Sequence, residues 1–313
     1  MQVILNSLVP IFAVIGLGIV LRRRSFLDEA ATRNFNRFAY YLGLPLFLFY
    51  KLSGAIAEGG LASRYTFTLI VTTVVAMLCG WVVATIAGIR FASRGAFVQA
   101  SLRGNLAFIG LPLVAFLITD LEANQRESIE AAMLVSLAPV IIFFNVASVA
   151  MLAIYNEGSE SNFSWRGVLR NIGTNPILLA CLAGVLVQRL GWRVPEAIER
   201  TCQIIGATAF PMALIGIGSQ LAQFSFSSQI RLPMASTAIK CVVCPVACWA
   251  IAMSIGLSGA ERQVLVVLAA MPTAVSSYVL AEQMNSDAEL AASSVAVSTA
   301  ASMLTLTVLL LML

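Results

Sequence analysis

The segment Arg103–Leu113, with the sequence RGNLAFIGLPL, places an arginine, two glycines and a proline inside an otherwise apolar stretch. Proline removes a backbone donor and clashes with the preceding turn, and glycine lowers the cost of leaving helical geometry. We therefore expect a membrane-length helix to break around Gly104, Gly110 and Pro112. Lipid offers no partner to the freed backbone groups, so solvent, substrate or other parts of the protein must satisfy them.

A second segment of the same kind lies about 166 residues further along the chain. Ala269–Tyr278, AAMPTAVSSY, again combines a proline, Pro272, with hydroxyl side chains at Thr273, Ser276 and Ser277. Two broken helices at corresponding positions in two halves of a chain indicate a transport site. The alternative is that glycine and proline serve only the close packing of helices. It explains these segments less well, because polar side chains accompany the breaks in both copies.

The same shift of 166 residues relates positions outside these segments, which predicts an internal repeat. A repeat with an odd number of spans inserts its second copy upside down, as in alternating-access transporters. We expect a first five-helix repeat at 1–155, a cytoplasmic linker at 156–166 and a second, inverted five-helix repeat at 167–313. The related positions are Pro10 and Pro176, Gly18 and Gly184, and Pro45 and Pro211.

Composition predicts an all-α membrane protein. Of the 313 residues, 59% are hydrophobic and 11% are charged, whereas a soluble domain has about 25% charged residues. Windows of about 20 apolar residues, the length that crosses the hydrocarbon core, predict ten transmembrane helices. These are Val3–Leu21, Phe35–Leu52, Tyr65–Ile89, Gly95–Thr119, Ala131–Tyr155, Ile172–Leu190, Ile198–Leu221, Leu232–Leu257, Glu261–Met284 and Ala291–Leu313.

Charge and residue usage indicate the location and exclude several function classes. Arg22–Arg24 follow the first span directly, and arginines are more frequent in the loops on that side, so both termini are expected on the non-cytoplasmic side of the cell inner membrane. The net charge of +4 does not indicate nucleic acid as a partner. Histidine is absent and the spans hold no central acids, so we expect no metal, no cofactor and no enzymatic activity.

Two cations, Arg103 and Lys240, lie inside predicted spans that hold no central Asp or Glu. Each costs about 2.5 to 3.5 kcal/mol at a helix centre, so an anionic ligand is favoured as their partner, although both side chains could instead snorkel to an interface. The predicted substrate-binding residues are Arg103, Asn105, Lys240, Thr273, Ser276 and Ser277. The predicted helix-break residues are Gly104, Gly110, Pro112 and Pro272.

Several of these segments resemble the auxin efflux carrier family, especially its bacterial branch of malonate and malate permeases. They are Arg103–Asn105 with Gly110–Leu113, Lys240–Pro245, Met271–Thr273 and Tyr278–Ala281. The resemblance implies a fold of the bile-acid, arsenite and riboflavin transporter type, in which spans 4 and 9 cross at Asn105, Pro112 and Pro272. It also implies a scaffold of spans 1, 2, 6 and 7 that forms a homodimer, and a transport domain of spans 3 to 5 and 8 to 10. Lys240 would replace the cation of related sodium-coupled folds.

The expected function is therefore secondary transport of small organic anions, mono- or dicarboxylates such as malonate or malate, by an elevator-type shift. An anion leaving a negative-inside cell gains about 2.3 kcal/mol per charge per 100 mV, so uniport or efflux needs no coupled ion. The alternatives are a sodium- or proton-coupled symporter of the bile-acid transporter type, and a channel. Plant auxin carriers of this family have a long cytoplasmic insertion where this chain has only Asn156–Trp165, so auxin itself is not the expected substrate.

Overall fold

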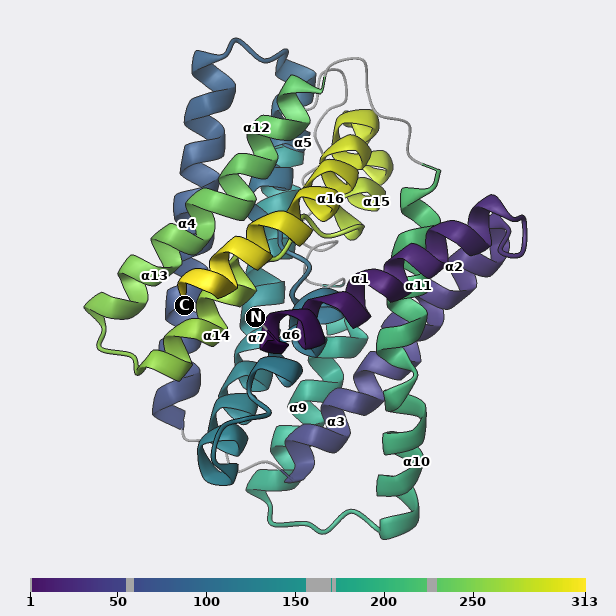
Figure 1. Cartoon of the computed structure of the whole chain (residues 1–313), viewed down its shortest axis with the longest axis vertical. Coiled ribbons are helices and arrows are strands. Elements are labelled where there is room, and N and C mark those ends of the chain that lie inside the picture. Colours follow the sequence, from purple (N-terminus) through teal and green to yellow (C-terminus); the bar gives the residue numbers. More distant parts are fainter. Residues whose placement is uncertain (1, 55–58, 156–169, 171–172, 224–229) are drawn as a thin grey trace.

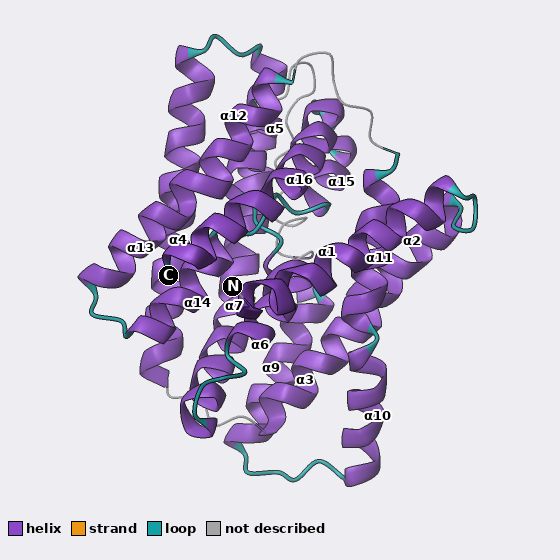
Figure 2. Cartoon of the chain, in the orientation of Figure 1, coloured by secondary structure: helices purple, strands orange, loops and turns teal. Residues whose placement is uncertain are grey.

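The protein is helical throughout its described parts, which confirms the all-α prediction. The computed structural model describes residues 2–54, 59–155, 170, 173–223 and 230–313, and the predicted linker at 156–166 lies outside them. Figure 2 shows helices joined by loops. Within the described ranges, the one β-type pairing is an isolated antiparallel bridge between Gly104 and Thr273.

The helices pack as two bundles, which lie on opposite sides of the view in Figure 1. In the first bundle, α1 lies along α11 and α3 lies along α9, so segments from the two halves of the chain are neighbours. The first bundle consists of α1 (Gln2–Arg23), α2 (Glu29–Phe38), η1 (Ala39–Gly43), α3 (Leu44–Gly54), α9 (Pro176–Arg189), α10 (Glu196–Ala207) and α11 (Ala209–Leu221).

The second bundle contains both predicted breaks. In it α4 packs on α5, α7 and α13, while α16 packs on α12, α15 and α5. The bundle consists of α4 (Gly59–Ile86), α5 (Phe91–Leu102), η2 (Leu106–Gly110), α6 (Leu111–Leu117), α7 (Ala123–Ile154), α12 (Arg231–Ala238), η3 (Ile239–Val243), α13 (Cys244–Ser254), α14 (Gly259–Ala269), α15 (Ser276–Gln283) and α16 (Ala288–Met312).

Helices occupy all ten regions in which the sequence predicts spans, but they are not equally long. Among the described residues, five helical stretches are long and apolar enough to cross a membrane: Gly60–Ile86, Ala123–Ile154, Glu196–Leu221, Arg231–Ser254 and Ala288–Met312. Spans 4 and 9 are not among them because a non-helical segment divides each into two shorter helices. The membrane class is thus confirmed, and the predicted breaks explain why these two spans are short.

Polar residues at the helix ends explain where several helices start. Asp28 accepts a hydrogen bond from the Ala31 amide at the start of α2, and Asn175 accepts from the Ile177 amide at the start of α9. Ser258 and Glu261 form a reciprocal capping box at the start of α14. These side chains satisfy amides that have no partner within their own helix.

Glycines allow the paired helices of the first bundle to approach closely. A Cβ atom on Gly18 of α1 would lie 2.3 Å from the Ile215 carbonyl oxygen of α11, and one on Gly184 of α9 would lie 3.1 Å from the Phe49 carbonyl oxygen of α3. A Cβ on Gly43 would lie 3.0 Å from the Ala209 Cβ. Small residues at such crossings are typical of membrane helix packing.

Candidate functional site

The two broken helices meet at their breaks, where the main chains pair directly. The helix ends at Leu102 in the first and at Ala269 in the second, and a short non-helical segment follows in each. The Asn105 amide donates to the Pro272 carbonyl at 2.8 Å, and the Ala274 amide donates to the Arg103 carbonyl at 3.0 Å. Each break thus satisfies backbone groups of the other, which the apolar surroundings make necessary.

Thr273 joins three helices at this crossing. Its hydroxyl donates to the Ala100 carbonyl at the end of α5 at 2.8 Å, and its amide donates to Ser298 Oγ of α16 at 3.0 Å. The last carbonyls of a helix have no partner within the helix. Thr273 therefore caps the other broken helix, and it fixes the crossing to α16.

Lys240 lies within the crossing and does not reach an interface. It belongs to the π-helical segment η3 and is 3% exposed, and its Nζ donates to the Ala269 carbonyl at 2.5 Å. A Cβ on Gly104 would lie 3.1 Å from this Nζ, so only glycine fits there without displacing the lysine. The carboxyl end of a helix has partial negative charge, which favours a cation. Lys240 therefore satisfies the end of α14, and the snorkelling alternative is wrong for this residue.

Two of the predicted break residues, Gly110 and Pro112, lie in the helical segment after Asn105. The Asn105 side chain accepts from the Phe108 amide at 3.3 Å and starts the π-helical segment η2. A Cβ on Gly110 would lie 2.9 Å from Leu268 Cδ2, so this glycine allows η2 to pack against α14. Pro112 is the second residue of α6, which continues η2 without a gap, so its missing N–H removes one backbone donor from that helix.

The structure brings the six predicted binding residues to one region but exposes them unequally. Asn105, Lys240, Thr273 and Ser277 are 5%, 3%, 1% and 0% exposed, whereas Ser276 is exposed and Arg103 is half-buried. In this conformation the surface of the chain includes Ser276 and part of Arg103 but not the other four. The polar residues of the crossing thus divide into an internal set that holds the breaks and an accessible pair.

Arg103 has no acidic partner in the described parts of the chain. The ion pairs there join Arg33 to Glu29, Lys51 to Glu130 and Arg200 to Glu196. Its guanidinium interacts electrostatically with Tyr40, a half-buried residue of the π-helical segment η1 in the first bundle. Arg103 therefore lies where the crossing faces the first bundle, and it has positive charge to offer an anion.

A small cavity lies beside Lys240, within the second bundle. Its volume is about 10 Å³, and its lining includes Thr72 and Thr73 of α4, Lys240, Cys244 and Ala269. That volume is at the lower limit for one water molecule. A carboxylate substrate does not fit next to Lys240 in this conformation.

Three residues at the site were not singled out from the sequence. Ser298 and Tyr40 contact the crossing from α16 and from η1, and only the fold brings them there. Gln99, one turn before the first break, is 0% exposed, and neither polar atom of its side chain has a hydrogen-bond partner. A glutamine alone in an apolar half-helix is a signal that the sequence did offer.

Residues with ligand chemistry for a metal are not grouped in the described parts of the chain, where no cluster of three His, Cys, Asp or Glu residues occurs. The three cysteines of span 8, Cys241, Cys244 and Cys248, are buried thiols. They pack in the interior as small apolar side chains. The chemistry available at the crossing is therefore binding by charge and hydrogen bonds.

Comparison with known proteins extends over almost the whole chain. The family described as "Membrane transport protein" matches residues 3–310. The chain is 25% identical over 305 residues to "Uncharacterized transporter YfdV" of Escherichia coli, covering 94% of this chain and 92% of the relative. It is 26% identical over 328 residues to a Rhizobium meliloti protein named "Putative malonate transporter", covering 99% and 96%.

Similarity to plant carriers is limited to part of the chain. "Auxin efflux carrier component 8" of Arabidopsis thaliana is 27% identical over 124 residues, which cover 39% of this chain and 34% of the relative. The match to the family over nearly the full length, together with the polar crossing of two broken helices, determines the class. The chain belongs to the membrane transport protein family that includes the auxin efflux carriers, and it is a multi-pass secondary transporter, not an enzyme.

Proposed function

We propose that this protein transports small organic anions, mono- or dicarboxylates such as malonate or malate. The observation that supports this most directly is Arg103, a half-buried cation at the crossing with no acidic partner in the described chain. Guanidinium binds carboxylates through strong, charge-assisted hydrogen bonds. The exposed hydroxyl of Ser276 offers a further donor at the start of α15.

The six predicted binding residues have two different roles in this proposal. Arg103 and Ser276 contact the substrate, whereas Lys240 and Thr273 hold the two breaks in the geometry that presents them. Asn105 and Ser277 lie next to the break in each segment, are buried like Lys240 and Thr273, and belong to the same supporting set. This division follows the difference in exposure between the two sets of residues. In the proposal, Lys240 takes the place of a bound cation at the end of α14.

An inverted repeat of two five-helix units is the architecture that we propose for this chain. Gly18 contacts Ile215, and Gly184 contacts Phe49. A shift of 166 residues converts Gly18 into Gly184 and Phe49 into Ile215, so the two contacts exchange under the repeat. Gly43 contacts Ala209, its own counterpart under that shift, as expected for a residue on a two-fold axis. The ten-span count and the boundary at 156–166 belong to the same proposal.

We further propose that the second bundle moves as a unit against the first, in an elevator-type shift. Spans 4 and 9 are joined by main-chain hydrogen bonds, span 8 is joined to them by Lys240, and span 10 by Ser298. Opening the crossing alone would leave these buried groups unpaired, at about 1–3 kcal/mol each. Moving the whole bundle keeps the bonds and still changes the side from which Arg103 is reached.

The remaining expectations complete the proposal. The arginine-rich loops place both termini on the non-cytoplasmic side of the inner membrane. Homodimer formation through spans 1, 2, 6 and 7 leaves the second bundle free to move. With no acid central in the spans, the membrane potential alone can drive efflux of an anion, at about 2.3 kcal/mol per charge per 100 mV.

The test is uptake of radiolabelled malonate and malate into proteoliposomes under an imposed membrane potential, without a sodium or proton gradient. Saturable flux driven by the potential is the expected result. Flux only after addition of a sodium or proton gradient would favour the coupled symporter instead. Absence of flux for both anions under all three conditions would contradict the proposed substrate class.

A further inference from the structure

An ion pair joins the two bundles at one end of their interface. Lys51 Nζ of α3 lies 2.8 Å from Glu130 Oε1 of α7, and the two side chains are 34% and 23% exposed. The other ion pairs in the described chain, Arg33 with Glu29 and Arg200 with Glu196, connect residues four apart within one helix. Lys51 and Glu130 therefore form the described ion pair that links the first bundle to the second.

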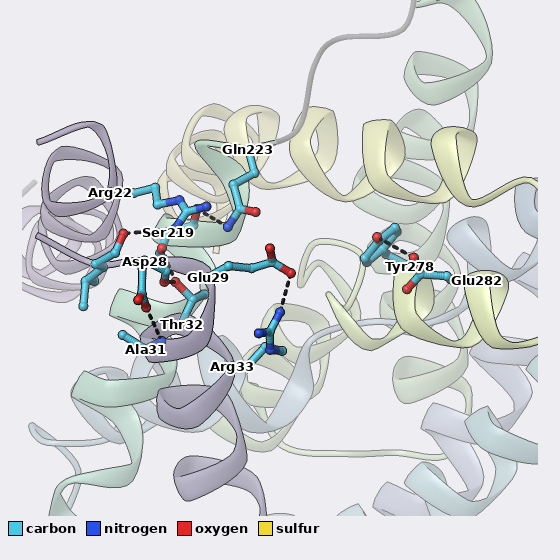
Figure 3. A network of polar contacts seen from close by, with 11 residues as sticks. Arg22, Asp28, Glu29, Ala31, Thr32, Arg33, Ser219, Gln223, Tyr278 and Glu282 are labelled. Carbon is cyan, nitrogen blue, oxygen red and sulfur yellow. Dashed lines mark hydrogen bonds and ion pairs between the residues drawn. The ribbon is translucent and has the colours of Figure 1, made fainter. Parts of the chain in front are cut away.

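At the opposite end of the interface, Glu29 pairs with Arg33 within α2 and not with the second bundle. Glu29 at the start of α2 and Glu282 of α15 are both exposed. Figure 3 shows the Glu29 carboxylate extending toward the side of α15 on which Tyr278 and Glu282 lie. Tyr278 donates to Glu282 Oε1 at 3.0 Å. In the described chain no ion pair joins α2 to α15, unlike the α3–α7 end.

We infer that the Lys51–Glu130 ion pair is a latch that stabilises the described arrangement of the two bundles. The inference rests on the proposed movement of the bundles, because a shift of α7 along α3 separates the two charged groups. Opposite charges favour contact at the α3–α7 end, where the described arrangement holds them 2.8 Å apart.

The size of the effect follows from the exposure of the pair. An exposed ion pair changes an equilibrium by less than about fivefold. The Lys51–Glu130 pair is about two-thirds buried or more and lies between apolar helices, where charges are screened less by water and salt. Loss of one partner should therefore change the ratio of the two arrangements by about three- to tenfold.

The test measures distances between spin labels at Arg24→Cys in the first bundle and Asn285→Cys in the second, both exposed positions. A Cys79→Ala background is sufficient, because the other five cysteines are buried. Lys51→Met and Glu130→Gln remove one charge each, and Lys51→Glu combined with Glu130→Lys restores the pair in reverse. Arg200→Gln is the matched control, since it removes an ion pair within α10 only.

The expected result is a three- to tenfold increase in the minor distance population for each single substitution, with a return toward the original ratio in the reversed pair. An unchanged distribution in Lys51→Met, Glu130→Gln and Arg200→Gln alike would overturn the latch. Malonate uptake by the same preparations separates the two ideas. Unchanged distances with intact uptake disprove the latch alone. Absence of flux for both malonate and malate under all three gradient conditions disproves the proposed function, while the distances still test the latch.

Discussion

The crossing of α1 with α11 and the crossing of the two broken helices join the same two halves of the chain in different ways. At the first crossing, Gly18 and Gly218 allow two helices to touch, and no described backbone hydrogen bond joins one helix to the other. At the second, the Gly104–Thr273 bridge pairs backbone groups between helices. The first crossing thus depends on the size of its residues, and the second on their polarity.

The largest effect is expected from a size change at the α1–α11 crossing. A Cβ on Gly218 would lie 1.9 Å from the Ile15 carbonyl oxygen, so Gly218→Leu forces the two helices apart. Overpacking against backbone should cost about 3 kcal/mol or more and prevent recovery of folded protein. Fluorescence size-exclusion chromatography measures this. Gly16→Leu in α1 is the control, because a Cβ there meets nothing within 4 Å. Equal yields for the two variants would contradict the size argument.

Loss of the accessible cation should affect transport without affecting the fold. Arg103→Gln removes charge-assisted hydrogen bonds to a carboxylate, worth about 1.5–3 kcal/mol, so the apparent KM for malonate should rise by about 10- to 100-fold. The thermal midpoint should stay unchanged, because Arg103 has no described ion pair to lose. Concentration-dependent uptake together with thermal unfolding checks both points. A KM within twofold of the original would exclude Arg103 from the substrate site.

Removal of the buried cation Lys240 tests whether this residue supports the crossing or binds the substrate. Lys240→Met leaves the Ala269 carbonyl without its partner, which costs about 1–3 kcal/mol, but it also removes a buried charge. Because the lost hydrogen bond and the removed charge offset each other, the stability of the protein should change little. Displacement of the break should lower the maximal uptake rate about tenfold, with a smaller change in KM. If KM rose as much as in Arg103→Gln, Lys240 would be a direct substrate ligand and not a support.

The smallest effect is expected from one cap within the crossing. Thr273→Val removes the hydrogen bond to the Ala100 carbonyl at nearly constant volume and should cost about 1 kcal/mol. The thermal midpoint should fall by about 2 °C, and uptake should be reduced less than in Lys240→Met. Thr273→Ser keeps the hydroxyl and serves as the control. A midpoint equal in both variants would show that this bond does not stabilise the crossing.

The sequence predicts the positions of these residues better than it predicts their bonding partners. Gly18, Gly104, Pro112 and Pro272 stand out in apolar stretches, and helices do end or change direction where the breaks were expected. The partners could not be predicted, because Thr273 bonds to Ala100 across 173 residues and Lys240 to Ala269 across 29. A sequence pattern records which backbone groups are freed, not which distant side chain satisfies them.

By itself, the sequence determined the membrane class, the helical content, the two breaks and the presence of two cations in spans without central acids, since these follow from hydropathy, proline and glycine geometry, and charge. Only the tertiary structure decided which polar residues are exposed. It left Ser276 exposed and Arg103 half-buried, and buried Lys240 against the end of α14. The physical reason is that each break must satisfy its backbone groups inside an apolar medium, and the fold determines which side chains are used for that purpose and which stay available for a ligand.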